Sequence, residues 1–275
     1  GIVDYLVEFR ERPDGAWAVF PHPPSTATTM SVSGLTNGIA YDFRVSAVTA
    51  SMTSSVSNLA TGIPEAPVKS ARVFLIGDST VCDYNPATTT QTGWGQVLFH
   101  YFENNVNFVN DADSGESTKS FYNGSVFWPA TKTRLSDGDY LLIQFGHNDS
   151  HDPAGSTDAT TPAVFKAYLQ SFINEAKALG AKPVLVSPMY RRMFENGVLV
   201  SYPVGTQPGS YGDLGPYASA MRELASANGN EDVPFIDLFT SSGFFMQAIG
   251  DAECTKLLQP NDRTHWNRKG ATVMA

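Results

Sequence analysis

Short and almost continuous apolar runs recur along the second part of the chain, each followed by polar and glycine-rich sequence. Runs of this kind are typical of parallel strands that are buried on both faces of a sheet. Between two of them, residues 163–179 carry apolar side chains at helical spacing and are followed by Gly180, which predicts a helix. Strands that alternate with helices predict an α/β fold with three layers, αβα, around a five-stranded parallel sheet. The predicted strands cover residues 73–76, 107–110, 140–143, 184–186 and 233–238.

The first part of the chain has a different pattern. Residues 5–10 and 41–48 alternate between apolar and polar side chains, which is typical of half-buried antiparallel strands. We therefore predict two domains. Residues 1–66 form a small β-domain, residues 67–71 a linker, and residues 72–275 the α/β domain.

Composition and charge narrow the classes of function. Hydrophobic residues make up 42% of the chain and charged residues 16%, as in ordinary globular proteins. The 18 basic and 27 acidic side chains give a net charge of −9, which argues against a nucleic-acid partner, because binding phosphates requires a basic face. No apolar run approaches the length of about 18 residues that a membrane span requires. No export signal follows Gly1.

Polar residues follow the predicted strands, at the edge where open parallel sheets bind their ligands. Ser79 follows the first strand, Gly115 the second and Asn148 the third, while Asp262 and His265 come after the fifth. Together they can carry out acyl transfer, because a serine becomes a nucleophile when a histidine accepts its proton and a carboxylate orients that histidine. We predict Ser79, Asp262 and His265 as catalytic residues. Backbone N–H groups of Ser79 and Gly115 and the Asn148 amide form the predicted oxyanion hole. This chemistry needs no metal and no cofactor.

The same residues resemble the SGNH (GDSL-type) hydrolases. Four signature segments of that family occur in order, namely Gly77-Asp78-Ser79, Gly115, Gly146-His147-Asn148-Asp149 and Asp262-x-x-His265. The resemblance covers residues 72–275 and implies a flavodoxin-like fold and serine esterase activity. Neither the G-x-S-x-G motif of α/β-hydrolases nor the H-E-x-x-H motif of zinc proteases occurs in the sequence.

Longer segments resemble the rhamnogalacturonan acetylesterases, namely residues 77–80, 93–95, 146–149, 188–192, 217–225 and 265–271. That resemblance implies removal of acetyl groups from galacturonate units of pectin by a secreted or cell-surface protein. An acidic protein needs local positive charge to bind an anionic polymer. We therefore expect Arg191 or Arg192, after the fourth strand, to contact a galacturonate carboxylate. Salt bridges to the protein's own acids are the alternative for both arginines.

The ends of the chain carry two further expectations. Residues 34–49 (GLTNGIAYDFRVSAVT) resemble the late strands of a fibronectin type III domain. This implies that residues 1–66 are part of a β-sandwich whose early strands precede Gly1. The final helix, predicted to begin near Asn267, is short for a helix that covers a sheet. We therefore expect the natural chain to extend beyond both ends.

Several alternatives stay open at this point. The same catalytic residues suit another SGNH esterase, such as a xylan acetylesterase, a lipase or a thioesterase. A non-catalytic carbohydrate-binding or adhesion protein is the alternative outside enzymes. Trp94 and Trp128 either stack on sugar rings or pack in the core, and Cys82 and Cys254 either form a disulfide or remain buried thiols. The sequence predicts no oligomeric state.

Overall fold

The computed structural model describes residues 1–65, 71–103, 105–151, 156–201 and 212–275. The chain divides into two units, residues 1–69 and 70–275. This boundary falls inside the predicted linker, 67–71. In the part of the chain that the structure describes, none of the helices is both long enough and apolar enough to cross a membrane.

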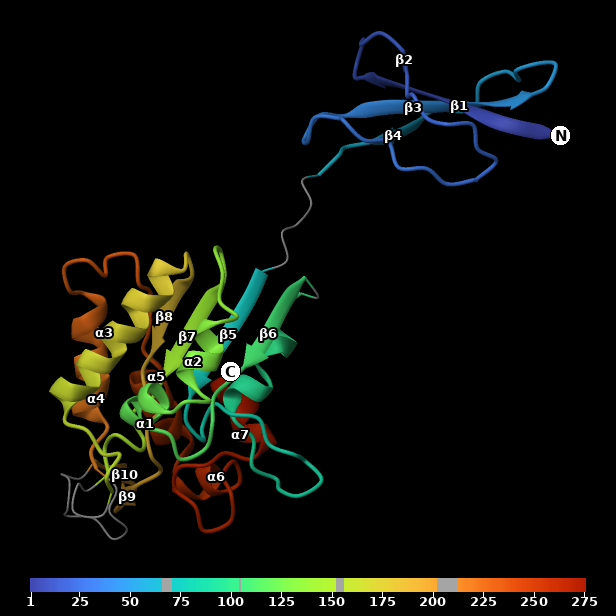
Figure 1. The fold of residues 1–275 in the computed structure, drawn as a ribbon. Helices are drawn as coiled ribbons and strands as arrows, with labels where there is room; N and C mark the ends of the chain where they lie inside the picture. Colours follow the sequence, from blue (N-terminus) through green and yellow to red (C-terminus); the bar gives the residue numbers. More distant parts are fainter. Residues whose placement is uncertain (66–70, 104, 152–155, 202–211) are drawn as a thin grey trace. The chain divides into compact units, whose positions relative to one another are not determined.

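The first unit is built on one antiparallel sheet. Its strands are β1 (Ile2–Glu11), β2 (Ala18–Val19), β3 (Tyr41–Thr49) and β4 (Ala60–Gly62). They pair in the order β2-β1-β3-β4 (Figure 1). The alternating pattern thus predicted the strands correctly. A sandwich needs a second sheet, and residues 1–65 contain only this one, so the fibronectin-like sandwich stays a prediction.

Charge pairs join the two long strands of this sheet. The register places Glu8 opposite Arg44 and Arg10 opposite Asp42. The two pairs have N–O distances of 2.8 Å and 3.0 Å, respectively. The ring of Trp17 contacts both guanidinium groups, which lie 4.0 Å (Arg44) and 4.9 Å (Arg10) from its centroid. Opposite charges on facing strands and cations above an indole both stabilise the sheet.

The second unit contains the predicted five-stranded parallel sheet. Its strands are β5 (Ala71–Gly77), β6 (Val106–Asn110), β7 (Tyr140–Gln144), β8 (Lys182–Val186) and β11 (Phe235–Ile236). They lie in the order β11-β8-β7-β5-β6, and every neighbouring pair is parallel. The prediction of a parallel α/β fold from the apolar runs is therefore confirmed. A short antiparallel pair, β9 (Phe194–Glu195) and β10 (Val198–Leu199), lies outside this sheet.

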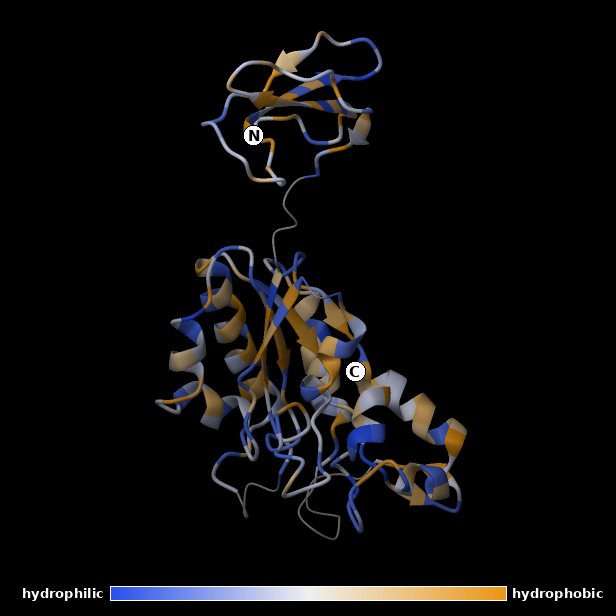
Figure 2. Cartoon of the chain, turned by 90° about the vertical axis from the view of Figure 1, so that its right-hand side faces the viewer, coloured by the Kyte–Doolittle hydropathy of each residue, from blue (hydrophilic) through white to orange (hydrophobic). Residues whose placement is uncertain are grey.

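Successive side chains of each strand point to opposite faces, and each face has its own core. On β5, Phe74 and Ile76 pack into one core, and Val73 and Leu75 into the other. The first face is covered by α1 (Thr118–Asn123), α2 (Trp128–Lys132), α3 (Pro162–Ala178) and α4 (Gly215–Ala225). The second is covered by η1 (Trp94–Gln96), η2 (Leu98–Tyr101), α5 (Leu238–Ile249), α6 (Asp251–Thr255) and α7 (Arg268–Met274). Figure 2 shows the hydrophobic strands between these two layers of helices.

The longest helix, α3, follows its sequence signals closely. It was predicted at 163–179 and covers Pro162–Ala178. The side chain of Thr161 accepts a hydrogen bond from the N–H of Val164, and Pro162 occupies the first turn. Both features favour a helix start. Its buried side chains are Phe165, Leu169, Phe172, Ile173 and Ala176.

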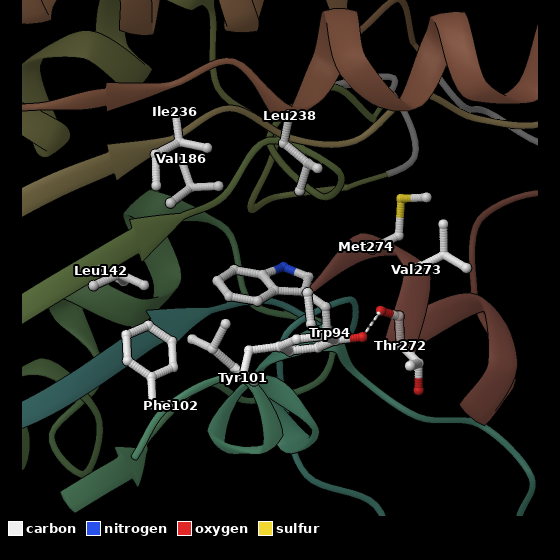
Figure 3. A pocket seen from close by; sticks show the side chains of 12 residues that line it. Trp94, Tyr101, Phe102, Leu142, Val186, Ile236, Leu238, Thr272, Val273 and Met274 are labelled. Atoms are coloured by element: carbon white, nitrogen blue, oxygen red, sulfur yellow. Dashed lines mark hydrogen bonds between the residues drawn. The ribbon is translucent and has the colours of Figure 1, made fainter. Parts of the chain in front are cut away.

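One apolar hollow remains on the second face of the sheet, beside α7. Its volume is about 490 Å³. Figure 3 shows Trp94, Tyr101 and Phe102 on one side of it and Val273 and Met274 on the other. None of the predicted catalytic residues is among those that line it.

Candidate active site

Ser79 lies in a tight turn at the carboxyl end of β5. The backbone N–H groups of Val81 and Cys82 both donate to the carbonyl of Asp78, at 3.0 and 3.1 Å. Gly77 precedes the turn where no side chain fits, because a Cβ there would lie 2.5 Å from a carbonyl oxygen of the neighbouring strand β7. The turn therefore holds the serine at the edge of the sheet, with 5% of its surface exposed.

The segment after α6 brings His265 to this serine, 186 positions away in the sequence. Nε2 of His265 lies 2.9 Å from Oγ of Ser79, and Nδ1 lies 2.8 Å from Oδ2 of Asp262. A carboxylate only accepts hydrogen bonds, so Nδ1 carries the proton and Nε2 accepts from the serine hydroxyl. The three predicted catalytic side chains thus lie in one hydrogen-bonded chain.

Hydrogen bonds from backbone N–H groups hold the carboxylate of Asp262 in position and stabilise its ionised form. Its Oδ1 accepts the N–H of Thr264 at 2.7 Å and that of His265 at 2.9 Å. Burial by itself raises the pKa of Asp262, but the hydrogen bonds from the His265 imidazole and these two N–H groups hold it well below its usual range. The carboxylate is therefore ionised whenever His265 becomes charged, and it stabilises that charge.

Two loops carry the predicted oxyanion donors Gly115 and Asn148. Gly115 lies in a turn after β6 with a φ of +89°, a conformation that favours glycine, and no atom lies within 4 Å of where its Cβ would be. Asn148 lies in the turn after β7, and its side-chain amide donates to the carbonyl of Glu116 at 2.9 Å. This bond places the amide beside the Gly115 turn. The amide has a second N–H with which it can bind an oxyanion.

A second histidine–aspartate pair lies beneath the serine turn. Nδ1 of His147 is 3.2 Å from Oδ2 of Asp78, and Nε2 is 3.1 Å from the carbonyl of Met189. Each ring nitrogen of this buried histidine therefore faces a hydrogen-bond acceptor. Burial raises the pKa of Asp78, but the charge and hydrogen bond of His147, together with bonds from Thr80, lower it below its usual range. The pair therefore connects the first and third signature segments.

Residues 73–275 match the family described as GDSL-like lipase/acylhydrolase. The chain belongs to this family. Rhamnogalacturonan acetylesterase RhgT of Bacillus subtilis is 36% identical over 220 residues, which cover 75% of this chain and 87% of RhgT. The probable rhamnogalacturonan acetylesterase YesY of the same species is 32% identical over 209 residues, 74% of this chain and 88% of YesY. The crystal structure of B. subtilis YxiM aligns with 100% of this chain and 72% of its own, at 25% identity and a TM-score of 0.60.

As a member of the GDSL-like family, the chain is a carboxylic ester hydrolase. Within the described residues, no group of three or more His, Cys, Asp and Glu side chains is placed to hold a metal ion.

The two arginines predicted to bind substrate have contacts within the protein. Arg191 is 4% exposed, and its guanidinium donates to the carbonyls of His147 and Gly212, both at 2.8 Å. Arg192 pairs with Asp251 at 2.5 Å. These contacts favour the alternative that the sequence left open, in which both arginines bind groups of the protein. A contact with galacturonate stays a prediction that this geometry does not support.

Sequence reasoning missed the role of Asp149, which is completely buried. It accepts hydrogen bonds from the backbone N–H and the hydroxyl of Thr118 and from the hydroxyl of Thr160. Burial raises its pKa to about 6 despite these bonds. Asp149 therefore fastens the start of α1 to the Asn148 turn, and the only signal in the sequence is its place in the signature segment.

The remaining open residues belong to the core. Trp94 and Trp128 are 4% and 1% exposed, respectively, so they pack rather than stack on sugars. Cys82 and Cys254 are buried free thiols, not a disulfide. Burial raises the pKa of the Cys82 thiol to about 12, so it stays protonated and unreactive.

Proposed function

We propose that this hydrolase removes acetyl groups from acetylated rhamnogalacturonan, with Ser79 as the nucleophile. The observation that carries the proposal is the chain of two short hydrogen bonds from Ser79 through His265 to Asp262, at 2.9 and 2.8 Å. Two relatives that carry this activity in their names, one as probable, are more than 30% identical over most of both chains.

In the proposed first step, Oγ of Ser79 attacks the acetyl carbonyl while Nε2 of His265 takes the hydroxyl proton. The resulting oxyanion accepts hydrogen bonds from the backbone N–H groups of Ser79 and Gly115 and from the Asn148 amide, each worth roughly 3 kcal/mol. Collapse of the tetrahedral intermediate breaks the bond to the sugar oxygen, which leaves with the proton from His265.

In the second step, His265 takes a proton from water, and the hydroxide formed attacks the acetyl-serine. The new intermediate collapses to acetate, and Ser79 recovers its proton. Asp262 keeps Nδ1 of the imidazole protonated in both steps and stabilises the imidazolium. All atoms are accounted for by the ester, one water and these side chains.

Two features support a sugar ester over a long acyl chain. The apolar hollow beside α7 is the kind of site that a long acyl chain would need, but neither Ser79 nor His265 lines it. The Ser79 hydroxyl contacts the polar side chain of His265, and its sequence neighbours Asp78 and Thr80 are polar as well. Because a polysaccharide does not cross membranes, the proposal includes a secreted or cell-surface location.

The test is release of acetate by the full chain and by Ser79→Ala, each incubated with acetylated rhamnogalacturonan and with acetylated xylan. We expect serine-dependent release mainly from rhamnogalacturonan. Release mainly from xylan would keep the mechanism and overturn the substrate. Equal release by the Ser79→Ala variant would overturn the catalytic assignment.

A further inference from the structure

A groove of about 500 Å³ lies between the 84–96 segment and the 256–269 segment. Figure 1 shows α6 and α7, which flank the second segment, near the end of the sheet toward which the strands point. In open parallel sheets this is the edge where substrates bind. The volume is in the range of ordinary ligand sites.

Three cations line this groove, Lys256, Arg268 and Lys269, and no acidic side chain does. Lys256 pairs with Glu253 at 2.5 Å, but both are more than half exposed, so water screens the pair. Arg268 and Lys269 have no carboxylate partner in the described part of the chain. Such a concentration of positive charge contrasts with the net charge of −9 of the whole chain.

The other lining groups are suited to sugar hydroxyls. They include the hydroxyls of Thr89 and Thr90 and the amide of Gln91. Hydroxyl and amide groups both donate and accept hydrogen bonds, as sugar hydroxyls do. A groove that combines these groups with cations matches a polymer that carries both hydroxyls and carboxylates.

The walls of the groove are joined to each other and to the catalytic turn. The hydroxyl of Tyr84 donates to the carbonyl of Ser79 at 2.9 Å. The N–H of Thr92 donates to the carbonyl of Trp266 at 3.0 Å, and Trp266 directly follows the proposed base His265. Thr90 bonds to Gln259 across the groove at 2.8 Å. The groove is thus formed before any substrate binds, which lowers the entropy cost of binding.

We propose that this groove binds galacturonate units that flank the acetylated unit, with Lys256, Arg268 and Lys269 facing their carboxylates. The proposal rests on the proposed function for the identity of the polymer. It assigns the recognition of negative charge, which the sequence analysis expected of Arg191 or Arg192, to these three exposed cations.

The test compares two triple variants of the full chain that remove the same positive charge. The groove variant carries Lys256→Ala, Arg268→Ala and Lys269→Ala. The control carries Lys166→Ala, Lys177→Ala and Lys182→Ala, which lie on α3 and at the start of β8. Each triple variant also carries Ser79→Ala. Calorimetry then measures its binding of an unacetylated rhamnogalacturonan oligosaccharide and of a neutral xylo-oligosaccharide. Both variants lose three positive charges, so the comparison tests whether the place of the loss matters.

We expect the groove variant to raise the Kd for the anionic oligosaccharide about tenfold, and the control variant less than about twofold. Salt at about 1 M should remove most of the difference, because it shortens the screening length to about 3 Å. The proposal would be overturned if the two variants raised the Kd equally, or if the neutral oligosaccharide bound as tightly as the anionic one.

Acetate release separates this proposal from the proposed function. If the chain with Ser79 intact releases acetate from rhamnogalacturonan but the groove variant has an unchanged KM, the function stands and the groove proposal fails. If no acetate is released while the groove-dependent binding is present, the groove proposal stands and the assigned reaction fails.

Discussion

Two histidine–aspartate pairs lie at the same edge of the sheet and differ in what their second ring nitrogen meets. In the Asp262–His265 pair, Nε2 faces the hydroxyl of Ser79, and 27% of the imidazole is exposed. In the Asp78–His147 pair, Nε2 faces a backbone carbonyl, and 3% of the imidazole is exposed. The first histidine can exchange a proton with a substrate. The second is buried and held between two acceptors.

The comparison shows why a carboxylate beside a histidine does not identify a catalytic base. Both aspartates have a lowered pKa, and in both a histidine is among the causes. What distinguishes the pairs is access to the nucleophile and to solvent. We therefore expect the Asp262–His265 pair to determine the rate of the reaction and the Asp78–His147 pair to determine the stability of the fold.

The largest effect is expected at the first pair. In His265→Ala, Ser79 loses its proton acceptor, so kcat should fall by about 10⁴- to 10⁶-fold. The free energy of unfolding should change by no more than about 1 kcal/mol, since the imidazole is partly exposed. Acetate release and urea unfolding of the same preparations measure the two quantities. A variant that is both active and destabilised would reverse the assignment of the two histidines.

The second pair should give the opposite result. His147→Ala leaves the carboxylate of Asp78, which is 0% exposed, without its imidazole partner, so the free energy of unfolding should fall by about 3–5 kcal/mol. The matched control adds Asp78→Asn to His147→Ala, which removes the unpaired charge.

The two changes are in contact, so their effects should not add, and the double variant should lose less than the sum of the single variants. Urea unfolding of His147→Ala, Asp78→Asn, the double variant and the parent completes the cycle. Strict additivity would show that the two side chains do not act as a pair.

The sequence predicted the catalytic pair and not the buried pair for a physical reason. Asp262 and His265 are three residues apart, so local geometry alone can bring them together, and a serine after the first strand needs such a base. Asp78 and His147 are 69 positions apart and meet only because β5 and β7 are neighbours in the sheet. The apolar pattern predicts the five strands but not their order in the sheet.

The arginines illustrate the same limit. Arg191 was placed correctly after the fourth strand, but its partners come from loops that sequence spacing does not bring together. Its guanidinium bonds to the carbonyl of Gly212, 21 positions later, and to that of His147, 44 positions earlier. A charged residue at the active edge can bind substrate or hold loops together, and only the three-dimensional contacts distinguish these roles.

A third carboxylate sharpens the comparison, because Asp149 is buried beside these pairs without a histidine. Its pKa is raised from 3.8 to about 6, whereas those of Asp78 and Asp262 are lowered. The folded state therefore binds a proton on Asp149 that the unfolded chain has released above about pH 4. Stability from this group is fully present below about pH 4 and is lost as the pH rises through 6, a change of about 3 kcal/mol.

Asp149→Asn removes this titration while keeping a side chain of the same shape. The free energies of unfolding of the parent and the variant are measured with urea at intervals from pH 4 to 7. Relative to the variant, the parent should lose about 3 kcal/mol of stability as the pH rises across this window. Groups shared by both proteins cancel in the difference. The two lowered carboxyls titrate below about pH 3.8 and so contribute outside the window. Parallel curves from pH 4 to 7 would mean that Asp149 is ionised in the folded protein throughout, and that its hydrogen bonds with Thr118 and Thr160 stabilise the charge as well as a histidine does.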